Sequence, residues 1–350
     1  MKIKKLPFAE LIGSRISNEY ISHAGYFPKS PWGCEGQIYP SLTGIALLNL
    51  YQITKNDLYL RGVRSIIETN INKQVQSGGW PLYLGVNANG VRFHVPDEIT
   101  KITSSVEDLP PTVTALRLIA EYQSITQDRS YSKSLEKGFN YLRRFWNKNS
   151  GTFNEMLEGE SINLRASPKD YHIYAYQCVD SLQKIYPEVE EYVAPLYLAV
   201  KKNFEEMTAD TYPLIYGMHA AIIIKTECAS DYVITVVKEK ILEEIAIKSR
   251  FLIPSLPGAL GHRDGLRGIC LDEGHLRNSI GAALAMDFYE NATGTDIFSS
   301  SDSYAEIENW IQSMYDDGRY FEYVDVKNGR RYGDGSAGYF LPLFWILESF

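Results

Sequence analysis

The feature that most constrains this chain is a turn that recurs between helix-like segments. Three stretches place a threonine five residues before an aromatic residue: ITKNDLYL at 53–60, ITQDRSYS at 125–132 and ATGTDIFS at 292–299. IKTECASDY at 224–232 is a looser copy. A glycine follows each of the three threonines at a nearly constant distance, as Gly78, Gly151 and Gly318. Such recurrence predicts a fold built from copies of one supersecondary unit.

The repeat also assigns roles to its residues. We expect the threonine or the aspartate of the turn to end it and cap the second helix, and the aromatic residue to pack back onto the hairpin. Glycine suits the next turn because it adopts a positive φ at no steric cost. Trp80, in QSGGWPLY at 76–83, follows the first of these glycines. Its expected role is structural, at the end of the hairpin, and a place in the wall of a binding cleft is the alternative.

Hydrophobic periodicity predicts the helices of each hairpin. The segment 41–53 is apolar nearly all round, whereas 58–71 carries an apolar stripe opposite charged residues. The same alternation recurs in the pairs 112–125 and 131–146, 168–185 and 189–206, 214–225 and 233–248, and 274–289 and 304–315. A last apolar helix over 338–350 pairs with a first one over 6–20, and strand-like alternation is scarce.

Hairpins of this kind predict how the chain closes. An inner helix that is apolar all round cannot be buried by its own hairpin, but hairpins arranged in a ring bury one another's inner helices. We therefore expect an all-α fold, one (α/α)6 toroid of about twelve helices in six hairpins, forming a single domain over residues 1–350.

Composition limits the partners and the compartment. The net charge of −8 over 350 residues argues against a nucleic-acid partner, because phosphate binding relies on clustered lysine and arginine. No segment has the apolar run of a signal peptide or of a membrane span, so we expect a cytoplasmic protein with no membrane span. The sequence does not indicate whether the protein is a monomer or an oligomer.

The cysteines and the acidic residues bear on cofactors. Cys34, Cys178, Cys228 and Cys270 form no CxxC pair, which favours buried free thiols over a disulfide framework or a zinc site. No spaced ligand motif requires a metal, although the many carboxylates are compatible with a divalent one. The sequence thus predicts no required cofactor.

One stretch resembles two groups of helical toroids. KGFNYLRRFWNKNSGTF at 137–153, preceded by the threonine turn, resembles the outer helices of polysaccharide lyases, unsaturated glycuronyl hydrolases and sugar epimerases. It is also similar to the QW repeats of terpenoid cyclases and protein prenyltransferases, with Trp146 where that motif has its glutamine. Both resemblances imply the toroid fold, and neither implies one reaction, because a fold hosts many functions.

A second stretch tests the terpenoid resemblance. DLPPTVTALRL at 108–118 aligns with the DxDDTA segment of class II terpene cyclases, in which the middle aspartate donates the proton. Asp108 and Thr112 fit this segment, but Pro110 and Pro111 stand at its two remaining aspartate positions. Proline cannot donate a proton, so a cyclase of this kind would need to start its reaction differently.

Polar side chains concentrate in the loops that enter the apolar helices, and in an (α/α) toroid these loops meet at one mouth. The richest is GHRDGLRGICLDEGHLR at 261–277. We expect Asp272 or Glu273 to cap the following helix and Arg277 to pair with one of them. His262 and His275 then remain for chemistry.

Three sugar chemistries can use these residue types. Hydrolysis of a glycoside needs two carboxyl groups, for which Asp108 and Asp272 are the expected pair. Elimination from a uronic acid, or its epimerisation, needs histidine or tyrosine for proton transfer and arginine for the substrate carboxylate. The candidate catalytic residues are Asp108, Asp272, His275, His262 and Tyr216. The candidate substrate-binding residues are Trp32, Trp80, His172, His219, Arg263, Arg277 and Arg331. For His172 and His219, a hydrogen-bonded place in the core is the alternative.

The sequence therefore predicts an enzyme that acts on a sugar or oligosaccharide, with an acidic sugar favoured, by lyase, epimerase or hydrolase chemistry. Two other hypotheses remain open at this point. One is a terpenoid cyclase-like enzyme acting on an isoprenoid, and the other is a toroid that binds a partner without catalysis. Converging carboxylates, histidines and arginines would favour sugar chemistry, and a sealed aromatic cavity would favour an isoprenoid.

Overall fold

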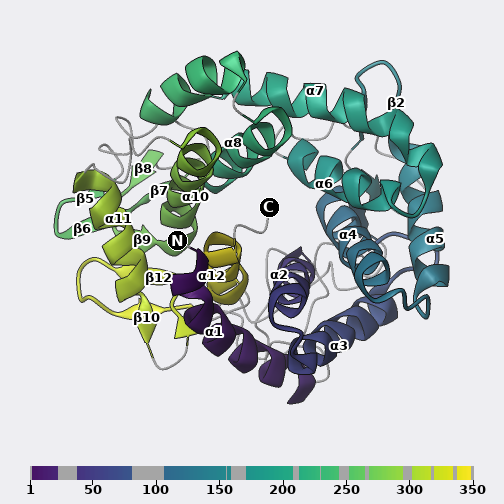
Figure 1. Ribbon diagram of the computed structural model, residues 1–350, viewed down its shortest axis with the longest axis horizontal. Coiled ribbons are helices and arrows are strands. Elements are labelled where there is room, and N and C mark those ends of the chain that lie inside the picture. The colour runs from purple at the N-terminus through teal and green to yellow at the C-terminus, as the bar shows by residue number, and fades with distance from the viewer. Residues whose placement is uncertain are drawn as a thin grey trace. The chain divides into compact units, whose positions relative to one another are not determined.

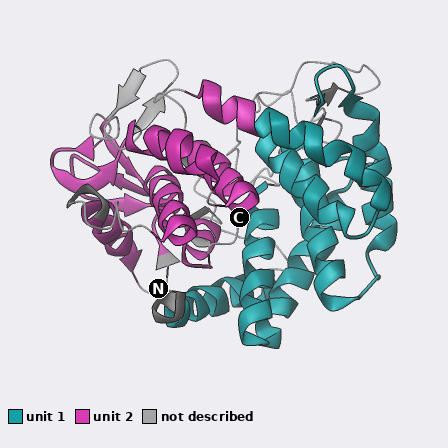
Figure 2. Cartoon of the chain, turned by 45° about the horizontal axis from the view of Figure 1, so that its top comes forward, with its two compact units in different colours: residues 1, 3–200 teal, residues 2, 201–350 magenta. Residues whose placement is uncertain are grey.

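The computed structural model describes residues 2–22, 38–80, 106–154, 156–158, 171–207, 213–228, 230–243, 252–264, 268–294, 302–316, 319–333 and 337–347. The chain forms two compact units, one of residues 1 and 3–200 and one of residues 2 and 201–350 (Figure 2). The expectation of a single domain stays a prediction. None of the helices in the described ranges is long and apolar enough to cross a membrane.

The first unit is built from helices with a few short strands. Its helices are α1 (Lys2–Ser22), α2 (Ile38–Thr54), α3 (Asp57–Lys73), α4 (Leu109–Thr126), α5 (Ser132–Leu142), α6 (His172–Gln183) and α7 (Glu190–Glu206), the last continuing into the second unit. Its strands are β1 (Val106–Asp108), β2 (Trp146–Asn147), β3 (Thr152–Phe153) and β4 (Met156–Glu158). Short 3₁₀ helices cover Arg143–Phe145 and Pro187–Val189.

In this unit α4 packs against both α2 and α6, while α3 packs against α2 and α4, and α5 packs against α4 (Figure 1). The residues from Leu109 to Ala120 of α4 are all buried, as an all-round apolar helix requires. In α3, Leu60, Val63 and Ile67 are buried while Arg61 is exposed. The predicted alternation between buried and half-buried helices is therefore confirmed here.

The second unit combines helices with more strands. Its helices are α8 (Pro213–Glu227), a π-helix (Val233–Val237), α10 (Leu276–Thr293), α11 (Asp302–Ser313) and α12 (Ala337–Leu347). Its strands are β5 (Leu252–Ile253), β6 (Leu256–Leu260), β7 (His262–Asp264), β8 (Gly268–Cys270), β9 (Glu273–His275), β10 (Tyr315–Asp316), β11 (Arg319–Tyr320), β12 (Tyr323–Asp325) and β13 (Arg331–Tyr332). Here α10 packs against α8 and α12, and α11 packs against β6 and α10. The indole Nε1–H of Trp345 donates to Asp287 Oδ2 at 2.8 Å, which ties α12 to α10.

The repeated turn has the same geometry in each strict copy. Every repeat threonine donates its hydroxyl to the carbonyl oxygen four residues earlier, at 2.7 to 2.9 Å, and the next residue has a positive φ. The threonines are Thr54, Thr126 and Thr293, followed by Lys55, Gln127 and Gly294. The threonine therefore ends the inner helix. The expected cap of the outer helix was wrong for α3, where Asn56 Oδ1 accepts the N–H of Leu58 instead.

The glycine and tryptophan of the repeat lie in the roles expected of them. Gly78 and Gly151 have φ values of +115° and +66°, and Gly318 lies outside the described residues. The Trp80 side chain is fully buried, and its Nε1–H donates to the carbonyl of Asn70 at 2.7 Å. Its ring covers Gly138, where a Cβ atom would overlap it. This burial favours the structural role of Trp80 over a place in a cleft wall.

Several helix boundaries differ from the predicted ones. The helix predicted over 131–146 ends at Leu142, and Trp146 instead begins β2, where its ring packs edge-on against Phe153 and Tyr192. The helix predicted from 274 begins at Leu276, because the residues before it form β9. Short strands are more frequent than the sequence pattern indicated, since they pair loop segments that lack long apolar alternation.

Candidate functional site

A small sheet at the start of α10 organises the site. Strands β13, β12 and β9 pair in that order, all antiparallel. Their register sets Tyr332 opposite Tyr323 and Tyr323 opposite His275. Side chains directly opposite each other on neighbouring strands lie on the same face and contact one another. The sheet therefore brings two tyrosines and one histidine into a row.

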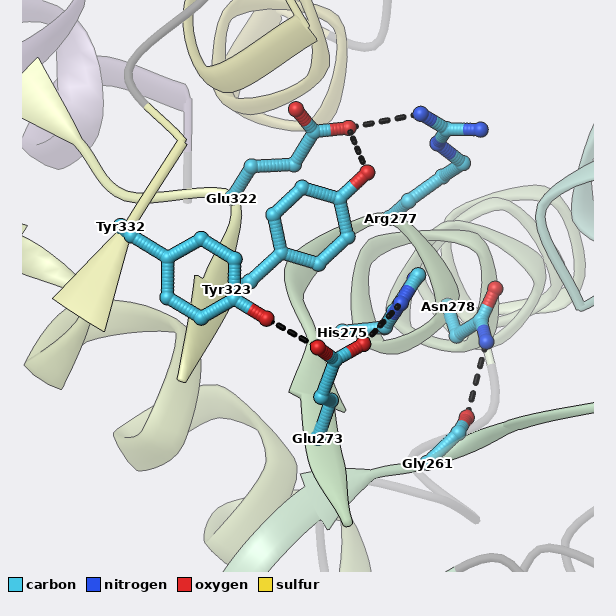
Figure 3. Close-up of polar contacts among 8 residues, drawn as sticks. All are labelled: Gly261, Glu273, His275, Arg277, Asn278, Glu322, Tyr323 and Tyr332. Carbon is cyan, nitrogen blue, oxygen red and sulfur yellow. Dashed lines mark hydrogen bonds and ion pairs between the residues drawn. The ribbon is translucent and has the colours of Figure 1, made fainter. Parts of the chain in front are cut away.

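His275 lies at the junction between this sheet and the helix. It is the last residue of β9 and the residue before α10, with φ −113° and ψ 113°. Its side chain is 7% exposed, and its ring meets the Tyr323 ring edge-on with the centroids 4.5 Å apart. Its Nε2 is 3.9 Å from Glu273 Oε2 (Figure 3). A buried imidazole thus contacts an aromatic ring and lies near a carboxylate.

Glu273 is held by the outer strand of the sheet. The hydroxyl of Tyr332 donates to Glu273 Oε1, and the Tyr332 ring stacks on Tyr323 at 5.3 Å. Glu273 precedes His275 by two residues in β9, so both side chains lie on the same face of the strand. One carboxylate oxygen is therefore bound by Tyr332 while the other faces the histidine.

Arg277 and Glu322 form an ion pair beside this row. Arg277 Nη2 donates to Glu322 Oε1 at 2.6 Å, and the Tyr323 hydroxyl donates to the same oxygen at 3.1 Å. The Glu322 side chain is 1% exposed, so the pair is largely withdrawn from water. The structure thus pairs Arg277 with Glu322, the residue before β12, rather than with the expected Asp272 or Glu273. Neither acid caps α10, since the residue before that helix is His275.

Asn278 is the third residue of α10 and is fully buried. Its Nδ2 donates to the carbonyl oxygen of Gly261 at 2.8 Å (Figure 3). This bond connects the first turn of the helix to the segment between β6 and β7.

The remaining candidates of the second unit lie in several places. Asp272 is exposed, and its carbonyl oxygen accepts the N–H of Val326 at 3.0 Å. Arg331 is exposed in β13. Tyr216 and His219 are buried in α8, which agrees with a core position, and the Tyr216 ring is 5.0 Å from Phe204. His262 and Arg263 lie in β7, opposite Cys270 and Ile269 of β8, and their side chains lie outside the described structure.

The candidates of the first unit are only partly described. His172 is buried at the start of α6. Asp108 ends β1 opposite Met156, with its side chain outside the described structure, and Trp32 lies outside it entirely. Asp108 belongs to the first unit and Asp272 to the second, so their use as a carboxylate pair stays a prediction.

The thiols and possible metal ligands can be stated for the described residues. Cys178 is buried, and this burial raises the pKa of its thiol, which keeps it protonated. The expectation of buried thiols was wrong for Cys228, which is exposed, while Cys34 and the side chain of Cys270 lie outside the described structure. Among the side chains that the structure describes, no group of three His, Cys, Asp or Glu could hold a metal ion.

Sequence reasoning found His275 but missed Glu322, Tyr323 and Tyr332. Their approach to the histidine depends on the pairing of strands nearly fifty residues apart in the chain, which periodicity does not reveal. One signal was present, namely Asn328 followed by Gly329, a pair typical of tight hairpin turns. Gly329 has a φ of +67° in the turn between β12 and β13. Recognising that hairpin would have predicted the two stacked tyrosines.

The chemistry available to this arrangement is proton transfer. Imidazole takes up and releases protons near neutral pH, and a carboxylate 3.9 Å away attracts the positive charge that it then carries. The Tyr323 ring and the surrounding sheet fix the imidazole in place. These are the properties of a general acid or base.

No family model matches the chain, and no curated protein matches it in sequence. Solved structures do match it in fold. The cellobiose 2-epimerase of Spirochaeta thermophila superposes with a TM-score of 0.68 at 12% identity, covering 98% of this chain and 97% of that one. A sugar epimerase from a ruminal bacterium gives 0.67 at 11% identity, covering 100% and 98%. A D-mannose isomerase gives 0.64 at 10% identity, covering 96% of each chain.

These similarities extend over nearly the full length of each chain, and at such identities they show the fold alone. The predicted all-α class and six-hairpin architecture are confirmed. The chain has the (α/α)6 toroid fold of carbohydrate-active enzymes such as sugar epimerases and isomerases.

Proposed function

We propose that the protein is a sugar epimerase or isomerase in which His275 moves a proton at a carbon atom of the sugar. The observation that carries the proposal is the position of His275, buried at the start of α10 between the Tyr323 ring and Glu273. The fold supports it by analogy, because the structures that it matches include enzymes named as epimerases and an isomerase.

The reaction proceeds on the open-chain form of the sugar. His275 takes the proton from the carbon next to the aldehyde, and the bonding electrons shift so that the carbonyl becomes an enediolate. Return of a proton to the opposite face of that carbon gives the epimer. Return to the neighbouring carbon, with transfer of the hydroxyl proton, gives the ketose. Both routes balance without an oxidant or a reductant. The ketose route requires only a group that takes and gives protons, whereas the epimer route also requires that the enediolate turn its other face to His275 or that a second donor supply the proton on that face.

The neighbours of His275 support this role by holding the ring and stabilising its charge. Glu273 lies near enough to attract the imidazolium that forms after proton uptake, and Tyr332 holds that carboxylate through its hydroxyl. Tyr323 limits the tilt of the imidazole and is itself bound to Glu322.

The substrate that fits best is a neutral sugar rather than the acidic one favoured by the sequence. An acidic sugar needs a cation for its carboxylate, and the guanidinium of Arg277 is already paired with Glu322 at 2.6 Å. The enzymes of similar fold are named for cellobiose and D-mannose, which carry no charge. Lyase chemistry on a uronic acid therefore has less support than epimerisation or isomerisation.

Product analysis tests the proposal. The protein is incubated with D-glucose, D-mannose, cellobiose and a uronic-acid disaccharide, and the products are identified by NMR. We expect an epimer or ketose of unchanged mass from a neutral sugar, and none from the His275→Gln variant. Lys327→Gln, in the exposed turn between β12 and β13, is the control and should act like the wild type. Cleaved glycosides would indicate a hydrolase, and an unsaturated uronic product would indicate a lyase. Either result, or full activity of His275→Gln, would contradict the proposal.

A further inference from the structure

The orientation of the Asn278 amide is set by its surroundings. Its Nδ2 lies 2.8 Å from the Gly261 carbonyl oxygen, and only the amide nitrogen can donate to a carbonyl. A flipped amide would set two acceptor oxygens against each other. The direction of Asn278 Oδ1 is therefore fixed by the backbone at Gly261.

The fixed oxygen of Asn278 lacks a donor. Oδ1 is buried and has no hydrogen-bond partner among the described residues, and the whole side chain has no exposed area. Nearly all buried polar atoms are hydrogen-bonded, because an unpaired acceptor forfeits its hydration without compensation. The donor must therefore come from outside the described residues, that is, from a segment of the chain that the structure does not describe, from an internal water molecule or from a bound ligand.

The place of Asn278 relative to His275 favours a ligand. His275 directly precedes α10 and Asn278 is its third residue, a spacing at which two side chains lie beside each other at a helix start. Figure 3 shows both at this end of the helix. In many helices the third residue bonds back to the residue that precedes the helix, but here its amide is bound to Gly261 instead.

We infer that Asn278 Oδ1 accepts a hydrogen bond from a hydroxyl group of the sugar bound at His275, and so helps to select which sugar is turned over. The inference rests on the proposed function, since it assigns a hydroxyl donor to the same site. A neutral sugar presents many O–H donors, whereas an ionised carboxylate presents only acceptors and would be repelled by Oδ1. The ligand is therefore a polyhydroxyl compound that places a hydroxyl group, and not a carboxylate, at this oxygen.

The test compares sugars that differ by one hydroxyl. Binding of D-glucose, D-mannose and cellobiose, and of the 3-, 4- and 6-deoxy forms of the two monosaccharides, is measured by isothermal titration calorimetry on the full chain. For the wild type, we expect one deoxy sugar to bind about tenfold more weakly than its parent, the size of a single net hydrogen bond. Asn278→Leu removes the acceptor and should bind the parent and that deoxy sugar equally. Asn278→Asp keeps an acceptor oxygen, and burial beside the Gly261 carbonyl favours a proton on its second oxygen that replaces the Nδ2 donor, so this variant should retain the discrimination.

Asn70 provides a matched control in the first unit. It is also buried, its Nδ2 donates to Ser41 Oγ at 3.0 Å, and its Oδ1 has no partner among the described residues. Asn70→Leu should leave the discrimination between sugars unchanged. If Asn278→Leu fails to fold, as judged by circular dichroism, the test compares Asn278→Asp with the wild type. Equal discrimination between the parent and the deoxy sugar then supports the inference, and its loss in the folded variant contradicts it.

The outcomes separate this inference from the proposed function. Discrimination that is unchanged in Asn278→Leu would show that the sugar hydroxyl does not bind at Oδ1, and would overturn the inference. So would discrimination lost in a folded Asn278→Asp, or no binding of any of the sugars. Epimer or ketose formation without any hydroxyl preference that depends on Asn278 would overturn the inference alone. A preference for the parent sugar over its deoxy form that depends on Asn278, observed without any epimer or ketose, would overturn the proposed reaction alone.

Discussion

Arg277 and Glu322 form an ion pair beside His275. Removing one partner of a buried ion pair destabilises the fold, because the other charge is then left buried without its partner. Both groups are largely withdrawn from water, with side-chain exposures of 14% and 1%. Arg277→Met would leave the Glu322 carboxylate buried without its cation, and we expect a loss of about 3–5 kcal/mol in the free energy of unfolding. Urea denaturation followed by circular dichroism measures this loss.

An exposed pair in the same unit serves as the control. Lys202 and Glu206 are 3.8 Å apart with side-chain exposures of 75% and 40%. Lys202→Met should therefore cost only about 0–1 kcal/mol, the usual value for a solvated pair. Equal losses in the two variants would mean that burial does not set the strength of the Arg277 pair.

The lowered pKa of Asp128 predicts that part of the free energy of unfolding of the first unit is lost at acidic pH. Its pKa is lowered from the ordinary 3.8 to about 2, first by the hydroxyl and backbone N–H of Ser130 and then by the hydroxyl of Tyr122. A carboxyl whose folded pKa is depressed stabilises the fold fully above its ordinary pKa, and this stabilisation is lost as the pH falls through 3.8 toward 2.

The measurement is urea unfolding at a series of pH values between about 5 and 2, for the wild type and for Asp128→Asn. The variant should lose stability less steeply over this window. Asp180→Asn, which changes an exposed carboxylate of α6, is the control and should follow the wild type. Parallel curves for all three proteins would argue against a role for Asp128.

Single residues show where sequence reasoning works and where it stops. His275 could be predicted because a histidine in a polar loop before an apolar helix has few structural uses. Glu322 could not, because its partner Arg277 is determined by the pairing of β9 with β12. The role of Trp80 was predictable from its place after the glycine of a repeated turn, since that place recurs along the chain.

At the scale of elements, the contact between α8 and α10 depends on two glycines. A Cβ atom at Gly217 would overlap the carbonyl oxygen of Gly281, and backbone atoms cannot move aside as a flexible side chain can. Gly217→Ala should therefore lower the free energy of unfolding by about 1–3 kcal/mol, the usual cost of overpacking, or by more. Thermal and urea denaturation measure the change.

Gly294, at the end of the same α10, gives a contrast. It has a φ of +68° and nothing lies within 4 Å of an added Cβ, so Gly294→Ala introduces only backbone strain. Its expected cost is about 1 kcal/mol. If both variants lost the same stability, close helix packing would not be the reason for glycine at 217.

The elements themselves were predictable in kind but not at every boundary. An all-round apolar pattern identified α2, α4, α8 and α10, because burial on every side leaves no polar stripe. The start of α10 was misplaced by two residues, since Gly274 and His275 have no pattern that separates a short strand from a first helical turn. That error bears on the proposed function, because it is the strand that aligns His275 with Tyr323.

At the scale of the whole molecule, the fold is determined by repetition rather than by any long motif. The structure matches sugar epimerases over nearly its full length at 11–12% identity. So little identity can suffice because a hairpin needs only an apolar inner helix, a turn with a positive φ and a half-apolar outer helix. That pattern does not specify a reaction, since one fold hosts many functions.

The central claim is that His275 exchanges a proton with a carbon atom of a sugar, and hydrogen exchange with solvent tests it most directly. The wild type, His275→Gln and Lys327→Gln are incubated with D-glucose, D-mannose and cellobiose in deuterium oxide, and deuterium at the carbon next to the carbonyl is followed by NMR. We expect incorporation by the wild type and by Lys327→Gln, and none above the uncatalysed rate by His275→Gln. Incorporation that persists without the histidine, or none by the wild type with any of the three sugars, would contradict the account.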